Sequence, residues 1–433
     1  MTYSPTDVTN NTRDYLHFLN DCPSPFHAAS VVAQRLVDAG FTEHSETDPW
    51  DASPGGHVII RDGAVMAWLV PQTVSNDTAF RIVGAHTDSP TFTLKPHAST
   101  QTPDGWNQLG VEVYGGMLMN SWLDRELALA GRLVLADGSQ RLIRTKALAR
   151  IPQLAVHLDR GVNSEGLKLD PQQHLRPIWS VNSTDADVLD IIAEEAGLTS
   201  ADEITAYELV TIPTQAAALF GADAQFVASG RQDNLSSVHA GLVALEKYVA
   251  DGIPQTGDVC VFACFDHEEI GSQSRTGAAG PILSDVLTRT AHALGCDADG
   301  VARMIAGSTC VSADASHSVH PNYADRHDPD TRPIMGGGPI TKLNANQRYA
   351  TNANGIALWR RALAAAGVEG QEFVSHNSMP CGSTIGPITA TRLGITTIDV
   401  GIPLLSMHSA REMSHIDDQY ALTETLGAYW AGA

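Results

Sequence analysis

The densest group of reactive side chains in this sequence is Asp266-His267-Glu268-Glu269, which directly follows an apolar run at 259–265. Adjacent carboxylates at the end of a buried strand are costly, unless the charges are paired or bind a metal ion. Of two neighbouring glutamates, one can bind a metal while the other transfers a proton. This segment therefore indicates a metal-dependent hydrolase.

Other side chains that bind metals stand beside predicted strands or at the start of a predicted helix: His86 after 80–85, Asp314 after 309–313, His408 after 396–400 and Asp233 before 235–249. Together with Glu269 they offer three carboxylates and two imidazoles, which would leave about +1 of net charge around two divalent ions. Mixed nitrogen and oxygen ligands favour zinc, with cobalt or manganese as possible substitutes. Asp233 is the natural bridge, because a carboxylate has two oxygens and paired ions lie roughly 3.5–4 Å apart.

Each of these residues also has a structural interpretation when it is taken alone. An aspartate at a helix start, such as Asp233, is commonly an N-cap. A histidine near a strand end is commonly an ordinary core or surface residue, and Glu268 and Glu269 could be a solvated pair. A purely structural interpretation requires every one of these separate explanations to be true at the same time. A two-metal site explains all of the residues together, and the joint pattern therefore favours it.

Strands and helices alternate on both sides of a region with a different character. A proline-capped helix at 24–40, a hairpin at 57–70 and a strand at 80–85 come first. After residue 229, strands at 259–265, 309–313, 372–375 and 396–400 alternate with helices at 235–249, 282–294, 355–366 and 417–430. The alternation predicts an α/β fold with helices on both faces of a sheet.

The region between these stretches has short strands, a hairpin at 132–144 that turns at Asp137-Gly138, and a single helix at 186–196. We therefore predict a mixed-sheet catalytic domain formed by residues 1–91 and 226–433. Residues 92–225 are predicted to form an inserted β-rich domain.

Composition and charge exclude some kinds of binding partner and indicate a cellular compartment. The formal net charge of −22 argues against binding to nucleic acid or to anionic membranes. No stretch approaches the roughly 20 apolar residues that span a bilayer, and the first 20 residues lack a signal-peptide pattern. Cys260 and Cys264 would lie roughly 13 Å apart on a strand, beyond disulfide reach. The six cysteines are therefore expected to be free thiols in a cytoplasmic protein.

Several long sequence blocks resemble those of one family, the aspartyl aminopeptidase family of dinuclear zinc metallopeptidases. They are the segments at 84–90 (GAHTDSP), 230–234 (GRQDN), 267–272 (HEEIGS), 312–317 (SADASH), 338–344 (GPITKLN) and 407–412 (MHSARE). The blocks occur in the family's order and extend over nearly the whole chain.

The resemblance implies roles for individual residues. His86 and Asp314 would bind one metal ion, Glu269 and His408 the other, and Asp233 would bridge them. Glu268 would act as the general base, and Asp88 would hydrogen-bond the far nitrogen of His86. The resemblance also implies a cis peptide bond between Asp233 and Asn234.

Four further residues would contact substrate by resemblance: His157, His317, Lys342 and Tyr349. His157, in the inserted domain, would reach the active site of a neighbouring subunit and stabilise the developing oxyanion. Lys342 would pair with an acidic side chain of the substrate.

These observations predict a zinc-dependent aminopeptidase that hydrolyses the N-terminal peptide bond of short peptides, with N-terminal Asp or Glu preferred by resemblance. The resemblance also implies a dodecameric homo-oligomer with active sites facing an inner cavity. Two alternatives stay open. One is a tetrahedral aminopeptidase of neutral or broad specificity, and the other is a non-catalytic oligomeric scaffold.

Overall fold

The buried strand β14 (Val259–Phe265) lies inside a nine-stranded sheet, and its residues point alternately into two apolar cores. Cys260, Phe262 and Cys264 belong to one core, whereas Val259 and Val261 belong to the other. This division follows from the two-residue period of a strand, and it requires apolar side chains throughout because both faces are covered. The computed structural model describes residues 4–183, 187–250 and 252–433.

The nine-stranded sheet has mixed pairing. Its strands are, in spatial order, β1 (Thr42–Glu43), β2 (Gly55–Arg61), β3 (Ala64–Val70), β14, β4 (Phe80–His86), β15 (Thr309–Ala313), β19 (Thr396–Gly401), β17 (Ile340–Leu343) and β18 (Gln371–Val374). The central strands β14, β4, β15 and β19 are parallel to one another. Their carboxyl ends therefore meet at one edge of the sheet, where α/β proteins place their sites.

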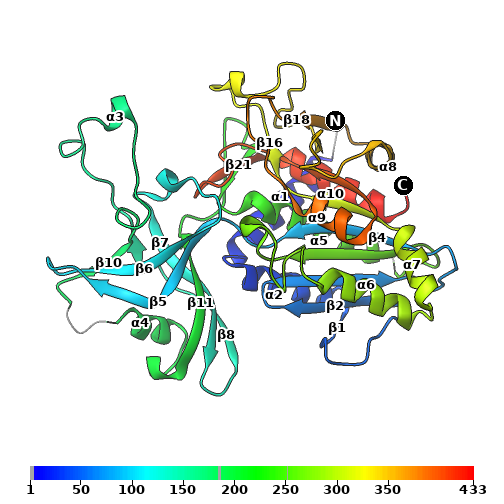
Figure 1. Cartoon of the computed structure of the whole chain (residues 1–433), viewed down its shortest axis with the longest axis horizontal. Coiled ribbons are helices and arrows are strands. Elements are labelled where there is room, and N and C mark those ends of the chain that lie inside the picture. The colour runs from blue at the N-terminus through cyan, green and yellow to red at the C-terminus, as the bar shows by residue number, and fades with distance from the viewer. Residues whose placement is uncertain (1–3, 184–186, 251) are drawn as a thin grey trace.

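Helices cover both faces of this sheet (Figure 1). The core on one face contains residues of α1 (Pro5–Asp21), α2 (Pro25–Asp38), α5 (Gln232–Ala250), α8 (Ala353–Ala366) and α10 (Ile416–Trp430). The core on the other face contains residues of α6 (Ile282–Ala293), α7 (Ala298–Ala306) and α9 (Ile385–Leu393). No helix in the described part of the chain is long and apolar enough to cross a membrane.

A second body, at the left of Figure 1, contains a seven-stranded antiparallel sheet with its own core. Its strands are, in spatial order, β11 (Ile204–Pro213), β5 (Thr91–Gln101), β6 (Trp106–Tyr114), β10 (Ile178–Val181), β9 (Ala149–Arg150), β7 (Glu126–Leu135) and β8 (Gln140–Arg144). A further pairing of β11 with β7 closes the strands into a barrel. Helix α4 (Val188–Glu195) packs on it, and the short α3 (Val162–Glu165) lies on a projecting segment.

Small elements complete the fold. Strands β12 (Ala218–Phe220), β13 (Phe226–Ser229) and β21 (Glu412–His415) form a three-stranded sheet, and β16 (Ser316–His317) pairs with β20 (Pro403–Leu404). The 3-10 helices are η1 (Met119–Trp122), η2 (Ala201–Glu203), η3 (Glu268–Ile270) and η4 (Ala324–Arg326).

The predicted fold class, α/β with a separate β-rich part, is confirmed. The strands predicted at 259–265 and 309–313 have the bounds of β14 and β15, and the hairpin at 57–70 is β2 and β3. The helix predicted at 186–196 is α4, and residue 186 lies outside the described residues. Helices α1, α7 and α9 were not predicted.

Candidate metal centre

The proposed metal ligands gather at the carboxyl edge of the parallel strands. His86 is the last residue of β4, Asp314 directly follows β15, and Glu269 lies in η3 just after β14. Asp233 is in the first turn of α5, and His408 is in the loop that precedes β21. The topology thus brings together residues that are up to 322 positions apart in the sequence, from His86 to His408.

The two oxygens of Asp233 face different histidines. Its Oδ1 lies 3.4 Å from Nε2 of His86, and its Oδ2 lies 3.2 Å from Nε2 of His408. Asp314 Oδ1 lies 3.7 Å from His86 Nε2, and Glu269 Oε2 lies 3.4 Å from His408 Nε2. The ligand atoms form two groups that share Asp233, as expected for a bridging carboxylate between two ions.

The donor set fits zinc, because imidazole nitrogens and carboxylate oxygens are its ordinary ligands. Asp233 Oδ1 and Glu269 Oε1 are buried, and among the described residues neither accepts a hydrogen bond. Buried carboxylate oxygens without donors are costly unless a cation satisfies them. The Asp233-Asn234 peptide bond is cis, which confirms the prediction.

The pKa values of the two histidines are raised by the negative charge that is concentrated at this site. Burial would lower the pKa of His408, but contacts with Asp233 and Glu269 raise it to about 10. The pKa of His86 is likewise raised well above its ordinary value by Asp233 and Asp314, against the effect of burial. Divalent ions bound to neutral imidazoles would replace these protons, and metal binding should therefore release protons.

Asp88 connects His86 to the glutamates. His86 Nδ1 lies 3.3 Å from Asp88 Oδ1 and 3.1 Å from the Asp88 carbonyl oxygen. The backbone N–H groups of Glu268 and Glu269 each donate to the Asp88 carboxylate at 3.1 Å. Despite burial, His86 and Tyr114 hold the pKa of Asp88 below its ordinary value. Asp88 is therefore an anionic acceptor that fixes His86 and the backbone of Glu268 and Glu269.

Glu268 is placed for proton transfer at the edge of the ligand cluster. Its Oε2 lies 3.9 Å from His86 Nε2, and its side chain is 16% exposed, which leaves it open to water. Burial and the neighbouring carboxylates Asp314 and Asp233 raise its pKa to about 8, against the effect of His86. Divalent ions bound beside Glu268 would lower this pKa and leave it as the carboxylate that a general base requires.

Two residues at the centre were not assigned roles from the sequence. The carboxylate of Glu412, which is 2% exposed, accepts from the backbone N–H of Asp233 at 3.1 Å and of His408 at 2.8 Å. Tyr114 donates from its hydroxyl to Asp88 Oδ2 at 2.6 Å. The position of Glu412 within the 407–412 block was the only signal in the sequence, and nothing in the sequence pointed to Tyr114.

The three substrate-binding candidates outside the inserted region lie together. Lys342 is 2% exposed, and its Nζ donates to the Ala315 carbonyl at 2.7 Å and lies 3.5 Å from Asp314 Oδ2. The same ammonium lies 5.3 Å from the centre of the Tyr349 ring. Burial and the charge of Lys342 lower the pKa of His317 to about 4.

His157 is the predicted site residue that this chain does not bring to the centre. It lies in an exposed turn, and no described contact joins it to a metal ligand. Its neighbours Leu154, Val156 and Leu158 are 64%, 50% and 75% exposed. Apolar exposure of this extent is typical of a surface that another chain covers.

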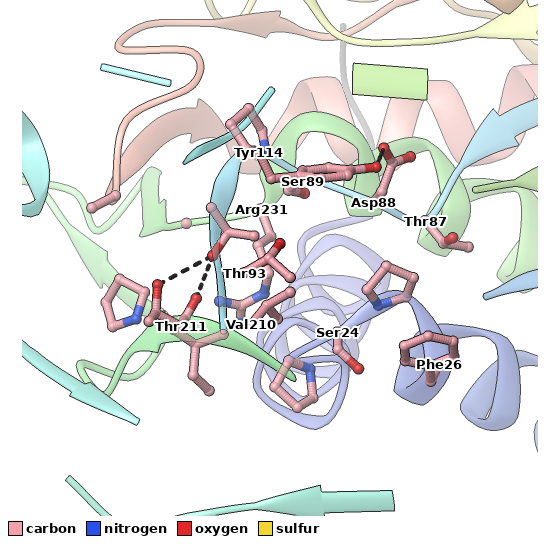
Figure 2. Close-up of a pocket in the computed structure, with 18 of the residues that line it drawn as sticks. Ser24, Phe26, Thr87, Asp88, Ser89, Thr93, Tyr114, Val210, Thr211 and Arg231 are labelled. Atoms are coloured by element: carbon pink, nitrogen blue, oxygen red, sulfur yellow. Dashed lines mark hydrogen bonds between the residues drawn. The ribbon is translucent and has the colours of Figure 1, made fainter. Parts of the chain in front are cut away.

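A cavity of about 180 Å³ lies beside Asp88, between the two bodies of the molecule. Figure 2 shows Tyr114 and Asp88 on one side of it and Ser24 and Phe26 on another. Its lining includes residues of the barrel strands β5, β6 and β11, of helix α2 and of the loops that follow β4 and β14, but none of the five proposed metal ligands. The hydrogen bond from Tyr114 to Asp88 therefore connects the barrel to the metal centre at the junction.

Comparisons with known proteins agree with this geometry. Residues 18–430 match the family described as aminopeptidase I zinc metalloprotease (M18). A relative from Streptomyces coelicolor, named a probable M18 family aminopeptidase 2, is 50% identical over 424 residues, 97% of each chain.

Solved structures give the same result. The cryo-EM structure of the Ape4 and Nbr1 complex contains a chain with a TM-score of 0.94 and 33% identity, which covers 99% of this chain and 87% of that one. The S. cerevisiae mApe1 dodecamer has a TM-score of 0.86 at 26% identity, covering 97% of this chain and 96% of that one.

Proposed function

The chain belongs to the M18 family of zinc aminopeptidases, and from this membership we propose that it removes the N-terminal residue of short peptides, with two zinc ions per subunit. The observation that carries the proposal is Asp233, whose two carboxylate oxygens face His86 and His408 separately. Bound zinc supplies Lewis acidity and lowers the pKa of water.

The residues of this chain have distinct tasks in the proposed reaction. His86, Asp233 and Asp314 hold one ion, and Asp233, Glu269 and His408 hold the other. Glu268 accepts the proton of the attacking water and delivers it to the leaving amine, because it is the carboxylate beside the ligand cluster that no ligand role requires. Asp88 keeps the His86 ring oriented while this happens.

The test of this function is hydrolysis of Asp-, Glu-, Leu- and Ala-p-nitroanilides by the wild-type protein and by Glu268→Gln. We expect the variant to lose about 10²–10⁴-fold in kcat, because a positioned general base contributes that factor. Its zinc content should stay unchanged. Glu369→Gln, which changes an exposed glutamate on another part of the surface, should behave as wild type. An active Glu268→Gln enzyme would contradict the assigned base.

We propose, by resemblance, that N-terminal Asp or Glu is preferred, with Lys342 as the cation that binds the substrate carboxylate. An ammonium has three N–H donors. One goes to the Ala315 carbonyl and a second points towards Asp314, which leaves one for substrate. The burial of Lys342 also favours the alternative, a neutral or broad specificity. A lysine that is 2% exposed and already contacts the Ala315 carbonyl and Asp314 can stabilise the Asp314 carboxylate without binding substrate.

The variant Lys342→Met distinguishes these specificities. If the lysine binds substrate, kcat/KM for the Asp and Glu substrates should fall at least about tenfold more than for Leu and Ala, because a charged hydrogen bond is lost. The ratio between substrates is independent of any general damage near Asp314. Equal losses for all four substrates would support the neutral or broad specificity.

We further propose that residues 92–225 form an oligomerisation domain and that the chain assembles as a homo-oligomer, a dodecamer by resemblance. The exposed leucines and valine around His157 support this proposal, as does the dodecamer formed by the similar S. cerevisiae mApe1. In such an assembly His157 would stabilise the oxyanion in a neighbouring subunit, and His317 and Tyr349 would contact the substrate. All six cysteines are free thiols, which supports a reducing, cytoplasmic location.

A further inference from the structure

Three potential metal ligands lie together at the edge of the large sheet, outside the centre described above. They are His44, just after β1, His57 in β2, and Asp51 in the loop that connects these strands. One ligand atom from each lies within 4.8 Å of the other two. None of the three residues belongs to an element that carries a ligand of the metal centre.

The two imidazoles point toward each other. His44 Nε2 and His57 Nδ1 are 2.9 Å apart, and His57 Nε2 is 2.9 Å from the Ser53 carbonyl oxygen. A carbonyl only accepts, so Nε2 of His57 carries the hydrogen and Nδ1 presents its lone pair to His44. A hydrogen bond from the second ring nitrogen to a carbonyl is the arrangement that fixes metal-binding histidines.

Aromatic packing holds the His57 ring in this orientation. The ring stacks on Trp68 with centroids 5.2 Å apart and an interplanar angle of 12°. Trp68 in turn stacks on Trp50 at 4.5 Å and 11°, and the guanidinium of Arg289 lies 4.2 Å above the Trp50 ring. The packing therefore fixes His57, and when an ion binds it is the His44 ring that turns.

Asp51 is held in place without its binding capacity being used up. Its Oδ1 accepts from the Ser53 backbone N–H at 2.8 Å, and its Oδ2 accepts from the Ser53 hydroxyl at 3.2 Å. Each carboxylate oxygen has a second lone pair, which stays available. Asp51 is exposed, whereas His57 is 2% exposed, so an ion can enter from solvent and be bound partly below the surface.

We propose that His44, Asp51 and His57 bind a third zinc ion, with water as the fourth ligand. Two imidazoles and one carboxylate leave one position of a tetrahedral site open, a ligand count that zinc accepts. On binding, the hydrogen between the rings moves to Nδ1 of His44, and both imidazoles stay neutral.

The consequence of such an ion would be structural. It would join the two ends of the loop at 45–54 and fix the end of the edge strands β1 and β2. Closing a loop with a metal ion stabilises the folded chain by reducing the freedom of the unfolded one. The site would not take part in peptide hydrolysis, because it shares no residue with the metal centre.

The test measures the zinc content of the purified enzyme and its affinity for added zinc. After dialysis in zinc-free buffer, elemental mass spectrometry should find one more zinc per chain in wild type than in His44→Gln. Zinc chloride titrated by calorimetry should bind at least about tenfold more weakly to Asp51→Asn. His292→Gln, an exposed histidine on α6, should match wild type.

Peptidase activity separates this ion from the catalytic pair. His44→Gln and Asp51→Asn should keep the wild-type kcat, because the lost ion is not one of those at Asp233. Equal zinc content and equal titration in wild type and both variants would overturn the proposal. Should His44→Gln fail to fold, Asp51→Asn decides alone, because an exposed side chain is replaced there by one of the same shape.

Discussion

At the scale of single residues, Glu412 contacts the backbone of two proposed metal ligands without being a proposed ligand itself. Its carboxylate accepts the backbone N–H groups of Asp233 and His408, one residue from each half of the centre. A glutamine side chain has one acceptor oxygen in place of two, and its amide N–H₂ would face a backbone donor. The position of both ligands therefore depends on this one carboxylate.

We expect Glu412→Gln to lower zinc affinity or kcat by about 10–100-fold, the usual cost of changing a group that orients a ligand. Zinc content and p-nitroanilide kinetics, measured on the same preparation, provide the readout. Glu369→Gln again serves as the matched control. A Glu412→Gln enzyme with wild-type zinc content and kcat would show that these two backbone contacts do not position the ligands.

The sequence indicated the ligands themselves because each follows an apolar strand or begins a helix, and strand ends have a defined place in an α/β fold. It did not indicate the contacts of Glu412 or Tyr114. Those contacts join residues that are 179 positions apart, in the case of Glu412 and Asp233, or 26 apart, in the case of Tyr114 and Asp88. Only the folded topology brings such pairs within hydrogen-bond distance.

At the scale of secondary-structure elements, one aspartate links three helices of the layer beside the sheet. Asp14 of α1 accepts from Arg35 of α2 at 3.0 Å and from His239 of α5 at 2.9 Å. Burial would raise the pKa of Asp14, but His239 and Arg35 lower it to about 2. Because the folded pKa is depressed, the carboxylate stabilises the fold above its ordinary pKa of 3.8, and this stabilisation is lost as the pH falls toward 2.

Asp14→Asn should therefore lower the stability at pH 7 by about 1 kcal/mol, discounted because the side chain is 40% exposed. The difference from wild type should shrink at pH 3. Urea unfolding midpoints at the two pH values measure both effects. Asp7→Asn, on the exposed side of α1, should leave the midpoint unchanged, and a difference that is the same at both pH values would contradict the role of the Asp14 charge.

Among the helices that the sequence did not predict, α9 has a weak local signal. Helix α9 contains Gly386 and Pro387 and several β-branched residues, which have low helix propensity. It forms because Thr384 accepts from the Gly386 N–H and because Ile385 packs into the core below the sheet. Tertiary packing decides the structure of such a segment, whereas β14 was predictable because all seven of its residues are apolar.

At the scale of the whole molecule, the position of His157 leads to a prediction about assembly. A subunit with His157→Ala has its own Glu268, and a subunit with Glu268→Gln has its own His157. If His157 acts in a neighbouring active site, co-expressed chains should form some sites with both residues intact. We expect the mixture to exceed both parent variants in kcat when size-exclusion chromatography shows a mixed oligomer.

The control is a mixture of His157→Ala with Glu268→Gln/His157→Ala, in which no site can hold both groups. Its kcat should not exceed that of His157→Ala alone. A co-expressed mixture with no more activity than its parents would show that His157 acts within its own chain or not at all. Neither outcome affects the metal ligands, which a single chain brings together without help.

The order of the ligands along the chain has a consequence for protein synthesis. His86 is translated before His408, which follows 322 residues later, and Glu412 and the helix α10 come later still. A nascent chain on the ribosome therefore lacks one side of its proposed metal centre until His408 has been translated. We expect products that terminate before His408 to be peptidase-dead, so that the cell is exposed to this hydrolytic activity only from chains that include it.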